Sequence, residues 1–259
     1  MARTGPPPLA TAEALTLPAR RSAPAAESWS LWRYRHAVSW LRRQSPRPRT
    51  LIDLGCGTGN GTCHLIAELG LRRALGIEED PVQLRAARAR GLAVRAGSLL
   101  DVSLATDLEE RFDVVLLGDV LHHLTGPGAE SRRSLARRAL VTARRLVAPG
   151  GSLVVLEPVY RSRLLRAGSF QLKRLTSRWL RRRCELGASW LNVGPPVVRF
   201  FDRAELVALL AEAGWEIAAL IESDQDRLGG IWRRGRLTAL ARPQSKRSTS
   251  TAIRSPERR

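Results

Sequence analysis

The chain has 259 residues, 44% of them hydrophobic, which suffices for one α/β domain with about 50–70 residues to spare. No apolar run approaches the ~18 residues of a membrane span, and three cysteines are too few for a disulfide framework or a zinc site. A secreted mini-protein, a collagen-like chain and an integral membrane protein are therefore excluded, and we expect a reduced, cytoplasmic setting.

The net charge of +19 is unevenly distributed along the chain. Residues 50–160 are neutral and 184–241 carry −2, whereas 1–49 carry +7, 161–183 carry +9 and 242–259 carry +5. Only two of the 43 basic residues are Lys, a ratio typical of coding bias in a GC-rich genome. We therefore favour a solvated basic surface over contact with nucleic acid, which remains the alternative.

Both ends of the chain lack the hydrophobic periodicity of a folded element. Residues 1–27 are rich in Pro and Ala, and their prolines interrupt any signal-peptide core. Residues 243–259 are rich in Ser, Thr and Arg. We predict that both segments are disordered and that 28–242 form a single folded domain.

Between these ends, short apolar runs alternate with longer amphipathic stretches. The first half is predicted to form a strand at 50–54, a helix at 59–69, a strand at 73–78, a helix at 81–90 and a strand at 92–96. Asp80 is expected to cap the second of these helices, with Pro81 at its first position.

The second half continues the alternation. It is predicted to form a strand at 112–117, a helix at 131–147, a strand at 152–156, a helix at 202–213 and strands at 215–221 and 236–241. Asp202 is expected to cap the helix at 202–213 as the first residue of a capping box, Asp202-Arg203-Ala204-Glu205. The strand at 112–117 is apolar almost throughout, which is typical of a strand buried on both faces. The alternation predicts an α/β fold, with a parallel sheet covered by helices on both sides.

A glycine-rich segment follows the first predicted strand and opens the first helix. It reads Asp53-Leu54-Gly55-Cys56-Gly57-Thr58-Gly59. Such glycines permit a tight turn and the close approach of a ligand to the backbone, beside the free N–H groups of a helix start. The spacing differs from a nicotinamide fingerprint, and the carboxylate of Asp53 favours a ligand with a cationic end. Glu78, at the tip of the second strand, can accept hydrogen bonds from two ribose hydroxyls.

In this order, the glycine motif and Glu78 resemble the class I S-adenosylmethionine-dependent methyltransferases, and the resemblance runs over residues 48–242. Residues 111–124, 146–151 and 201–216 are similar to that family's fourth strand, the turn into its fifth strand, and its last helix with strand six. The resemblance implies a Rossmann-like sheet of seven strands in the order 3-2-1-4-5-7-6, the seventh antiparallel, with helices on both faces. It also implies S-adenosylmethionine as the cofactor.

By the same resemblance, the cofactor-binding residues belong to the glycine motif and to the segments that follow strands two, three and four. They are Asp53, Gly55, Cys56, Gly57, Gly59, Glu78, Ser98, Leu99 and Asp119. Ser98 departs from the family pattern, in which an acid often takes the adenine amino group, although its hydroxyl and the Leu99 amide could serve the ring. For Asp119, an ordinary turn residue is the alternative.

Two histidines, His122 and His123, follow the fourth strand and are the candidate catalytic residues. Either could act as a general base for a phenol or hydroxyl. We favour a packed residue that shapes the pocket floor, because methyl transfer from a sulfonium depends mainly on alignment. The Val-Leu-His-His pattern at 120–123 resembles the small-molecule branch of the family, and no metal is expected.

Residues 158–200 form a predicted basic helical insertion before the last helix. Leu172, Leu175 and Trp179 recur there at helical spacing. We expect these three to form the buried side of a cap, with Leu175 and Trp179 contacting the substrate. A helix packed on the domain and a helix lying on an anionic membrane are the alternatives.

Aromatic residues gather before the first strand. They are Trp29, Trp32, Tyr34 and Trp40. This cluster predicts a helix over the cofactor pocket, although packing in the core would explain it equally well.

Together these features predict an enzyme that transfers a methyl group from S-adenosylmethionine to an O, N or C atom of a small-molecule or lipid-like acceptor. One alternative is a methyltransferase that acts on RNA or DNA through the Arg-rich segments. Another is a non-catalytic cofactor-binding domain used in protein interaction. Salt-dependent nucleic-acid binding would favour the first alternative, and binding without turnover would favour the second.

Overall fold

The computed structural model describes residues 31–101, 103–125, 129–160, 163–177, 179, 184–185, 192–193, 196–228 and 232–244. The predicted disorder of residues 1–27 and of 245–259 lies outside the described residues, as does Trp29, so these points stay predictions. Residues 243 and 244, which we assigned to the disordered tail, are ordered instead: Pro243 ends the last strand, and the Gln244 amide donates to the Gly214 carbonyl oxygen at 2.9 Å. No helix in the described part of the chain combines the length and the apolar character needed to cross a membrane.

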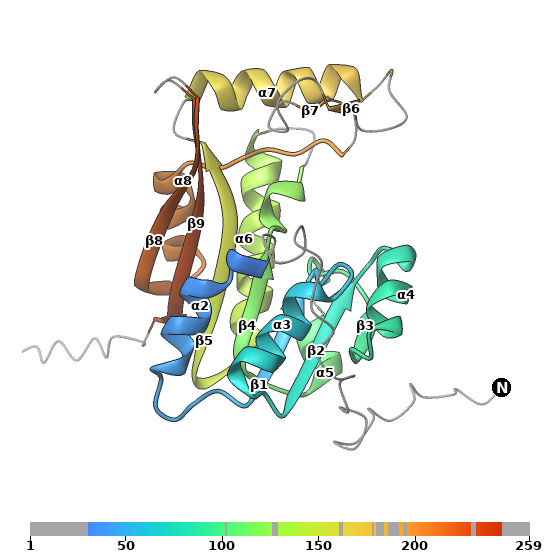
Figure 1. Cartoon of the computed structure of the whole chain (residues 1–259), viewed down its shortest axis with the longest axis vertical. Coiled ribbons are helices and arrows are strands. Elements are labelled where there is room, and N and C mark those ends of the chain that lie inside the picture. The colour runs from blue at the N-terminus through green and yellow to red at the C-terminus, as the bar shows by residue number, and fades with distance from the viewer. Residues whose placement is uncertain are drawn as a thin grey trace, which may run out of the picture.

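A seven-stranded sheet forms the centre of the domain (Figure 1). Its five parallel strands are β1 (Thr50–Leu54), β2 (Arg73–Glu78), β3 (Val94–Ala96), β4 (Phe112–Gly118) and β5 (Val147–Tyr160). β9 (Trp232–Pro243) runs antiparallel to its neighbours β5 and β8 (Trp215–Leu228). The order β3-β2-β1-β4-β5-β9-β8 is the predicted order 3-2-1-4-5-7-6 with its antiparallel seventh strand, and the predicted fold is confirmed.

Helices cover both faces of this sheet. One face packs against α2 (Arg35–Arg42), α3 (Asn60–Leu69) and α4 (Pro81–Ala89), and the other packs against α5 (Leu104–Leu108), α6 (Ala129–Leu146) and α8 (Arg203–Glu212). Alternation along β4 divides the two cores, because successive side chains of a strand point to opposite faces. Leu116 belongs to the core of the first face and Leu117 to that of the second, and neither is exposed to solvent.

The position of β1 creates the crevice in which a ligand can bind. The chain leaves β1 toward β2 and β3 on one side, and then returns to β4 on the other side of β1. Loops at the carboxyl ends of β1 and β4 therefore diverge, and in open α/β sheets this point is where ligands bind.

Local capping signals predicted from the sequence are confirmed. The Asp80 carboxylate accepts hydrogen bonds from the amides of Val82 (2.7 Å) and Gln83 (3.2 Å) at the start of α4. Asp202 likewise accepts from the Glu205 amide (2.7 Å) at the start of α8. These bonds satisfy N–H groups that have no partner within their own helix.

Three strands are longer than predicted. β5 starts at Val147, β8 reaches Leu228 and β9 begins at Trp232, so that the β8–β9 pairing continues well past the predicted ends. The added parts of β8 and β9 contain charged residues, which end the apolar signal while backbone pairing across the hairpin continues. In Figure 1 the three strands run together beyond the rest of the sheet toward α7 (Arg163–Thr176).

The insertion contains α7 and a two-stranded ladder of β6 (Cys184–Glu185) and β7 (Asn192–Val193). The expectation that Leu172, Leu175 and Trp179 form its buried side is wrong, because their exposed fractions are 36%, 58% and 87%. Lys173 lies on the inner side instead, with 5% exposed. Helical spacing identifies a common face but does not say which way that face is turned.

A pair of matched truncations tests these burial assignments. Leu140→Ala in α6, where the side chain is fully buried, is expected to lower the free energy of unfolding by about 2–5 kcal/mol through lost packing and a cavity. Leu175→Ala in α7 makes the same chemical change at an exposed position and should change it by less than about 0.5 kcal/mol. Urea unfolding measures both, and comparable losses would show that α7 is buried in solution.

Candidate active site

The glycine segment forms the turn between β1 and α3, as predicted. The amides of Gly55 and Cys56 both donate to the carbonyl oxygen of Ile77, at 2.8 and 3.1 Å, which ties the turn to β2. Gly55 has a φ of +85°, and a Cβ there would lie 2.7 Å from a methyl group of Val120. Only glycine permits this turn to approach the β4 loop so closely.

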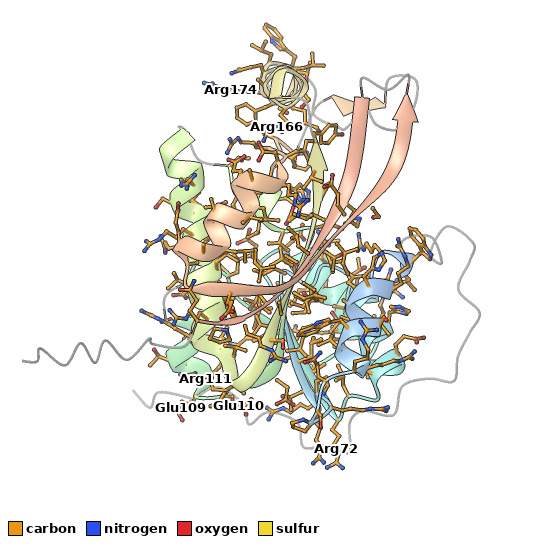
Figure 2. All side chains as sticks on the ribbon, turned by 90° about the vertical axis from the view of Figure 1, so that its left-hand side faces the viewer. Arg72, Glu109, Glu110, Arg111, Arg166 and Arg174 are labelled. Carbon is orange, nitrogen blue, oxygen red and sulfur yellow. The ribbon has the colours of Figure 1, made fainter. Side chains whose placement is uncertain are left out.

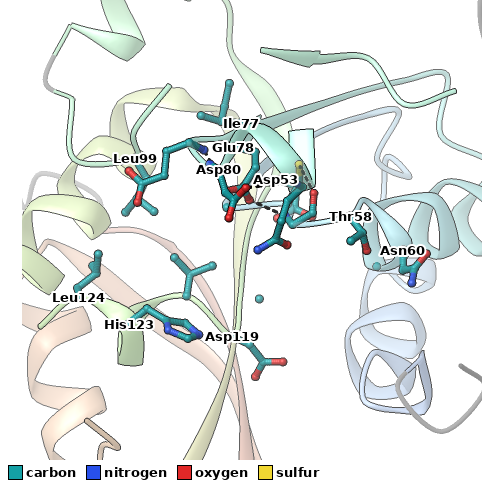
Figure 3. A pocket seen from close by; sticks show the side chains of 18 of the residues that line it. Asp53, Thr58, Asn60, Ile77, Glu78, Asp80, Leu99, Asp119, His123 and Leu124 are labelled. Carbon is teal, nitrogen blue, oxygen red and sulfur yellow. Dashed lines mark hydrogen bonds between the residues drawn. The ribbon is translucent and has the colours of Figure 1, made fainter. Parts of the chain in front are cut away.

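A cavity of about 650 Å³ opens at the carboxyl ends of β1, β2 and β4 (Figure 3). Its lining includes seven of the nine predicted cofactor-binding residues, namely Asp53, Gly55, Cys56, Gly57, Glu78, Leu99 and Asp119. Figure 3 shows Asp53 and Glu78 on one side of the space, with Asp119 and His123 across from them. The structure therefore brings together residues that are far apart in the sequence.

Two of the predicted residues, Gly59 and Ser98, lie outside this lining. Gly59 is the N-cap of α3 and faces Leu92 and Ala87, so its lack of a side chain serves the packing of α3 against neighbouring elements. The Ser98 hydroxyl accepts a hydrogen bond from the Leu100 amide at 3.3 Å and stabilises the turn after β3. Neighbouring Leu99 and Gly97 line the cavity instead.

Asp53 lies at the end of β1 with only 4% of its surface exposed. Burial raises the pKa of its carboxyl group to about 7, although the Thr62 hydroxyl donates a 2.5 Å hydrogen bond to it and Arg33 is nearby. The negative charge of Glu78 adds to the increase. An anion so poorly compensated by the protein itself is suited to a cationic ligand.

Glu78 is held by three backbone amides. One of its oxygens accepts from Gly57 at 2.8 Å, and the other accepts from Glu79 and Asp80 at 3.0 and 2.9 Å. These bonds fix the carboxylate against the glycine turn without any charged partner. The oxygen that accepts only from Gly57 retains a lone pair that can accept a hydrogen bond from a ligand's hydroxyl group.

Asp119 forms ion pairs with Arg33, just before α2, and with Arg236 of β9. Burial acts to raise the pKa of the Asp119 carboxyl, but Arg236 and Arg33 outweigh it and hold that pKa below its usual range. The Asp119 backbone has a φ of +58°, which is uncommon for a residue other than glycine. The three charged groups carry a net positive charge beside the cavity.

The two histidines differ in their surroundings. His122 is buried, and its Nδ1 lies 2.7 Å from a Glu157 oxygen whose partner oxygen accepts from the Val120 and Leu121 amides. It is absent from the cavity lining, whereas His123 contributes to it. Burial and the neighbouring His122 lower the pKa of His123 to about 4, so its imidazole is neutral at pH 7.

The aromatic cluster is divided. Tyr34 lines the cavity with 3% exposed, and it covers Gly61 so closely that a Cβ there would lie 2.1 Å from the phenol oxygen. Trp32 is exposed and Trp40 packs at the edge of the core, so neither lies in the lining. Both predictions for this cluster thus hold in part: α2 lies beside the pocket and packs on the sheet.

Some residues of the site were not identified from the sequence, and some predicted ones lie elsewhere. Arg33, Gln83 and Pro196 line the cavity, and Arg236 pairs with Asp119. Only Arg33 had a signal, its place within the aromatic cluster. Leu175 and Trp179 are absent from the lining, and their expected contact with the substrate stays a prediction. Among the described residues, no group of His, Cys, Asp and Glu side chains could hold a metal ion.

Comparisons with known proteins show the family to which the chain belongs. A family described as a methyltransferase domain matches residues 26–220. A ubiquinone biosynthesis O-methyltransferase of Rhodopseudomonas palustris (strain BisB18) is 35% identical over 109 residues, covering 40% of this chain and 38% of that protein. A trans-aconitate 2-methyltransferase of Methylobacterium radiotolerans is 30% identical over 175 residues, covering 66% and 59%. The matches thus span less than two thirds of the length of these curated relatives.

Among solved structures, an S-adenosylmethionine-dependent methyltransferase from Thermotoga maritima, described as a possible histamine N-methyltransferase, superposes with a TM-score of 0.54. It shares 20% identity and covers 83% of this chain and 89% of its own, which shows the common fold. With a family match over most of its length, the chain belongs to the methyltransferase-domain family. Its fold is that of the class I S-adenosylmethionine-dependent methyltransferases.

The raised pKa of Asp53 predicts a pH-dependent affinity for cationic cofactor. Below pH 7 the Asp53 carboxyl group holds a proton, which must be released when an ammonium group binds beside it. The affinity for S-adenosylmethionine should therefore fall by up to about tenfold for each unit by which the pH is lowered below 7. Calorimetry in two buffers of different ionisation enthalpy should detect the released proton at pH 6. A flat affinity between pH 6 and pH 8 would contradict this role for Asp53.

The variant Asp53→Asn supplies the control, with effects of opposite sign on binding and stability. The pKa of Asp53 is higher in the folded protein than in the unfolded chain, so ionisation of this group destabilises the empty protein as pH rises toward and above 7. Asp53→Asn should therefore remove the pH dependence of binding and weaken it at pH 8, while raising thermal stability of the free protein at that pH.

Steric access to the glycine turn can be tested separately. Gly57 has a φ of +57°, and a Cβ there would lie in the cavity, 2.9 Å from Gln83 Oε1. Gly57→Ala should reduce cofactor affinity more than tenfold, measured by calorimetry. Gly70→Ala is the matched control, because Gly70 has a φ of +63° but no neighbour within 4 Å, so it carries the backbone strain of about 1–2 kcal/mol alone. Equal affinities of the two variants would refute the placement of cofactor against this turn.

Proposed function

We propose that this chain transfers a methyl group from S-adenosylmethionine to a small-molecule or lipid-like acceptor. The observation that carries this proposal is the pair of carboxylates, Asp53 and Glu78, on either side of the glycine turn in one cavity. Asp53 suits an amino group and Glu78 suits a ribose diol, while the missing side chain of Gly57 leaves room beside the turn. When bound, the cofactor supplies an electrophilic methyl group on a sulfonium.

Arg33 completes the proposed recognition of an amino-acid end. Its guanidinium lies at the cavity, close enough to Asp53 for the two charges to influence one another. We infer that Asp53 binds the ammonium group and Arg33 the carboxylate of the same ligand, since a zwitterion needs one partner of each sign. Asp119 then acts by orienting Arg33, with which it is paired.

Acceptor binding is proposed on the side of His123, Leu124 and Pro196, which line the cavity away from the glycine turn. His123 is neutral at pH 7, and a group whose pKa is about 4 is a weak base for an acceptor hydroxyl. We infer that His123 orients the acceptor. His122, which is held by its bond to Glu157, packs against the His123 ring and positions that ring. Alignment, with exclusion of water, would then provide most of the rate.

The role of His123 can be tested by its conservative replacement. His123→Asn retains a polar group and should lower turnover less than about tenfold, since general-base catalysis of 10²–10⁴-fold is absent from this scheme. The measurement is kcat and kcat/KM against pH for whichever acceptor is found. A loss of more than a hundredfold, together with the disappearance of an ionisation near pH 4–7, would instead identify His123 as the base.

The experiment that tests the function as a whole begins with S-adenosylmethionine titration, for which we expect micromolar affinity, about −8 kcal/mol. Phenolic, quinone, amine and lipid acceptors are then screened for release of S-adenosylhomocysteine, with Gly57→Ala as the negative control. Binding without turnover across every pool would favour the non-catalytic alternative. Turnover restricted to RNA or DNA, weakened steeply by salt, would favour the nucleic-acid alternative.

A further inference from the structure

The helix α7 directs charged side chains toward the domain and apolar side chains toward solvent, the reverse of an ordinary surface helix. Its residues Arg166 and Lys173 face the domain, with 11% of the Arg166 side chain and 5% of Lys173 exposed. Leu172, Leu175 and Trp179 face solvent. An amphipathic helix normally buries its apolar stripe and exposes its charges, so the observed orientation leaves apolar surface without a partner among the residues that the structure describes.

Polar contacts hold α7 in this orientation. Arg166 pairs with Asp202 at 2.6 Å and with Glu205 at 3.2 Å, the two acids at the start of α8. Lys173 Nζ donates to the carbonyl oxygen of Pro196 at 3.3 Å. These three contacts join the inner face of α7 to segments outside the helix. Rotating the helix to bury Leu172 and Leu175 would break all of them.

The exposed apolar residues are concentrated here. Of the five large hydrophobic side chains that are exposed in the described part of the chain, three are on α7 or directly after it, and Trp179 is the most exposed at 87%. Burying such side chains is worth about 1.5–3 kcal/mol each when complete, so a protein that keeps three together in water forgoes substantial stabilisation. That pattern marks a contact surface.

The positive charge of this region indicates which kind of partner binds the exposed apolar surface. Residues 161–183 contain nine basic residues and no acid, and within them Arg174 is exposed at the side of α7 (Figure 2). Figures 1 and 2 show α7 lying across one extremity of the molecule. Exposed Leu and Trp side chains beside an exposed Arg, as found here, are typical of helices that lie in the interface of an anionic membrane.

We propose that α7 docks this protein on an anionic lipid bilayer, with Leu172, Leu175 and Trp179 entering the interface and the exposed Arg174 contacting acidic headgroups. A second copy of the chain fits less well, because a two-fold contact through α7 would bring two such basic segments together. RNA fits the charge but leaves the leucines in water. Docking does not depend on the proposed catalytic activity.

The docked orientation has a consequence for the cavity. Pro196, whose carbonyl binds Lys173, also lines the cavity, so a single hydrogen bond links the helix to the site. In Figure 1, α7 lies beyond the carboxyl ends of β4 and β5, the same end at which the cavity opens. If the proposed function holds, a bilayer on α7 is therefore close to the acceptor side.

Vesicle co-sedimentation of the full chain tests the proposal. The wild-type protein should bind vesicles of phosphatidylglycerol and phosphatidylcholine, and should bind pure phosphatidylcholine at least tenfold more weakly. Leu175→Glu should weaken binding at least tenfold. Val82→Glu is its matched control, because Val82 is 62% exposed and Leu175 58%, and both changes add one negative charge; this control should stay within twofold of wild type.

A second pair separates local contact from overall charge. Arg174→Glu on α7 and Arg72→Glu at the opposite end of the molecule (Figure 2) change the net charge equally. Only Arg174→Glu should weaken vesicle binding, by about fivefold or more per charge removed. Unchanged circular dichroism and unchanged cofactor affinity would show that each variant is folded.

Several results would overturn the proposal. They include equal binding to neutral and anionic vesicles, and equal losses in the two members of either pair. A dimer in vesicle-free solution that Leu175→Glu dissociates would assign the surface to a second copy. Tight binding of an RNA oligonucleotide that Arg174→Glu weakens and Leu175→Glu leaves intact, without vesicle binding, would assign it to nucleic acid.

Discussion

Three carboxylates, those of Asp53, Glu78 and Asp119, lie at the carboxyl ends of three adjacent strands, and their close burial is the constraint on which the site depends. Different groups stabilise each negative charge. Asp53 accepts a hydrogen bond from one hydroxyl, Glu78 accepts from three backbone amides, and Asp119 pairs with two arginines. The least compensated, Asp53, has the raised pKa. The protein thus tolerates an unfavourable charge that a cationic ligand would relieve, which links the electrostatics of the empty fold to its selectivity.

Local signals in the sequence predicted most of the fold. The strands at 50–54 and 73–78 and the caps at Asp80 and Asp202 each depend on neighbouring residues, and the structure has them as predicted. Contacts between distant residues were not predictable in this way. Asp119 meets partners 86 and 117 positions away, and no local pattern connects them. Similarly, the spacing of Leu172, Leu175 and Trp179 defined a helical face without showing that polar contacts on the opposite face would turn it outward.

Adjacent residues can also be separated by backbone geometry alone. Residue type alone does not distinguish His122 from His123. The short 3₁₀ turn at Leu121–His123 directs His122 toward Glu157 and His123 toward the cavity. What distinguishes them is a carboxylate at position 157, in the next strand of the sheet. Sequence reasoning recovered the pair as candidates, while the division of their roles required the three-dimensional arrangement.

The extended strands β5, β8 and β9 have a mechanical consequence. Because each is hydrogen-bonded to the next along its length, the three form one stiff arm that links the cofactor half of the sheet to the region of α7. The length of these paired strands sets the distance between the two regions. Substitutions at the far end of the arm can therefore change what the protein contacts there, while the pairing of the three strands and the hydrogen bond from Lys173 to Pro196 keep that region connected to the cavity.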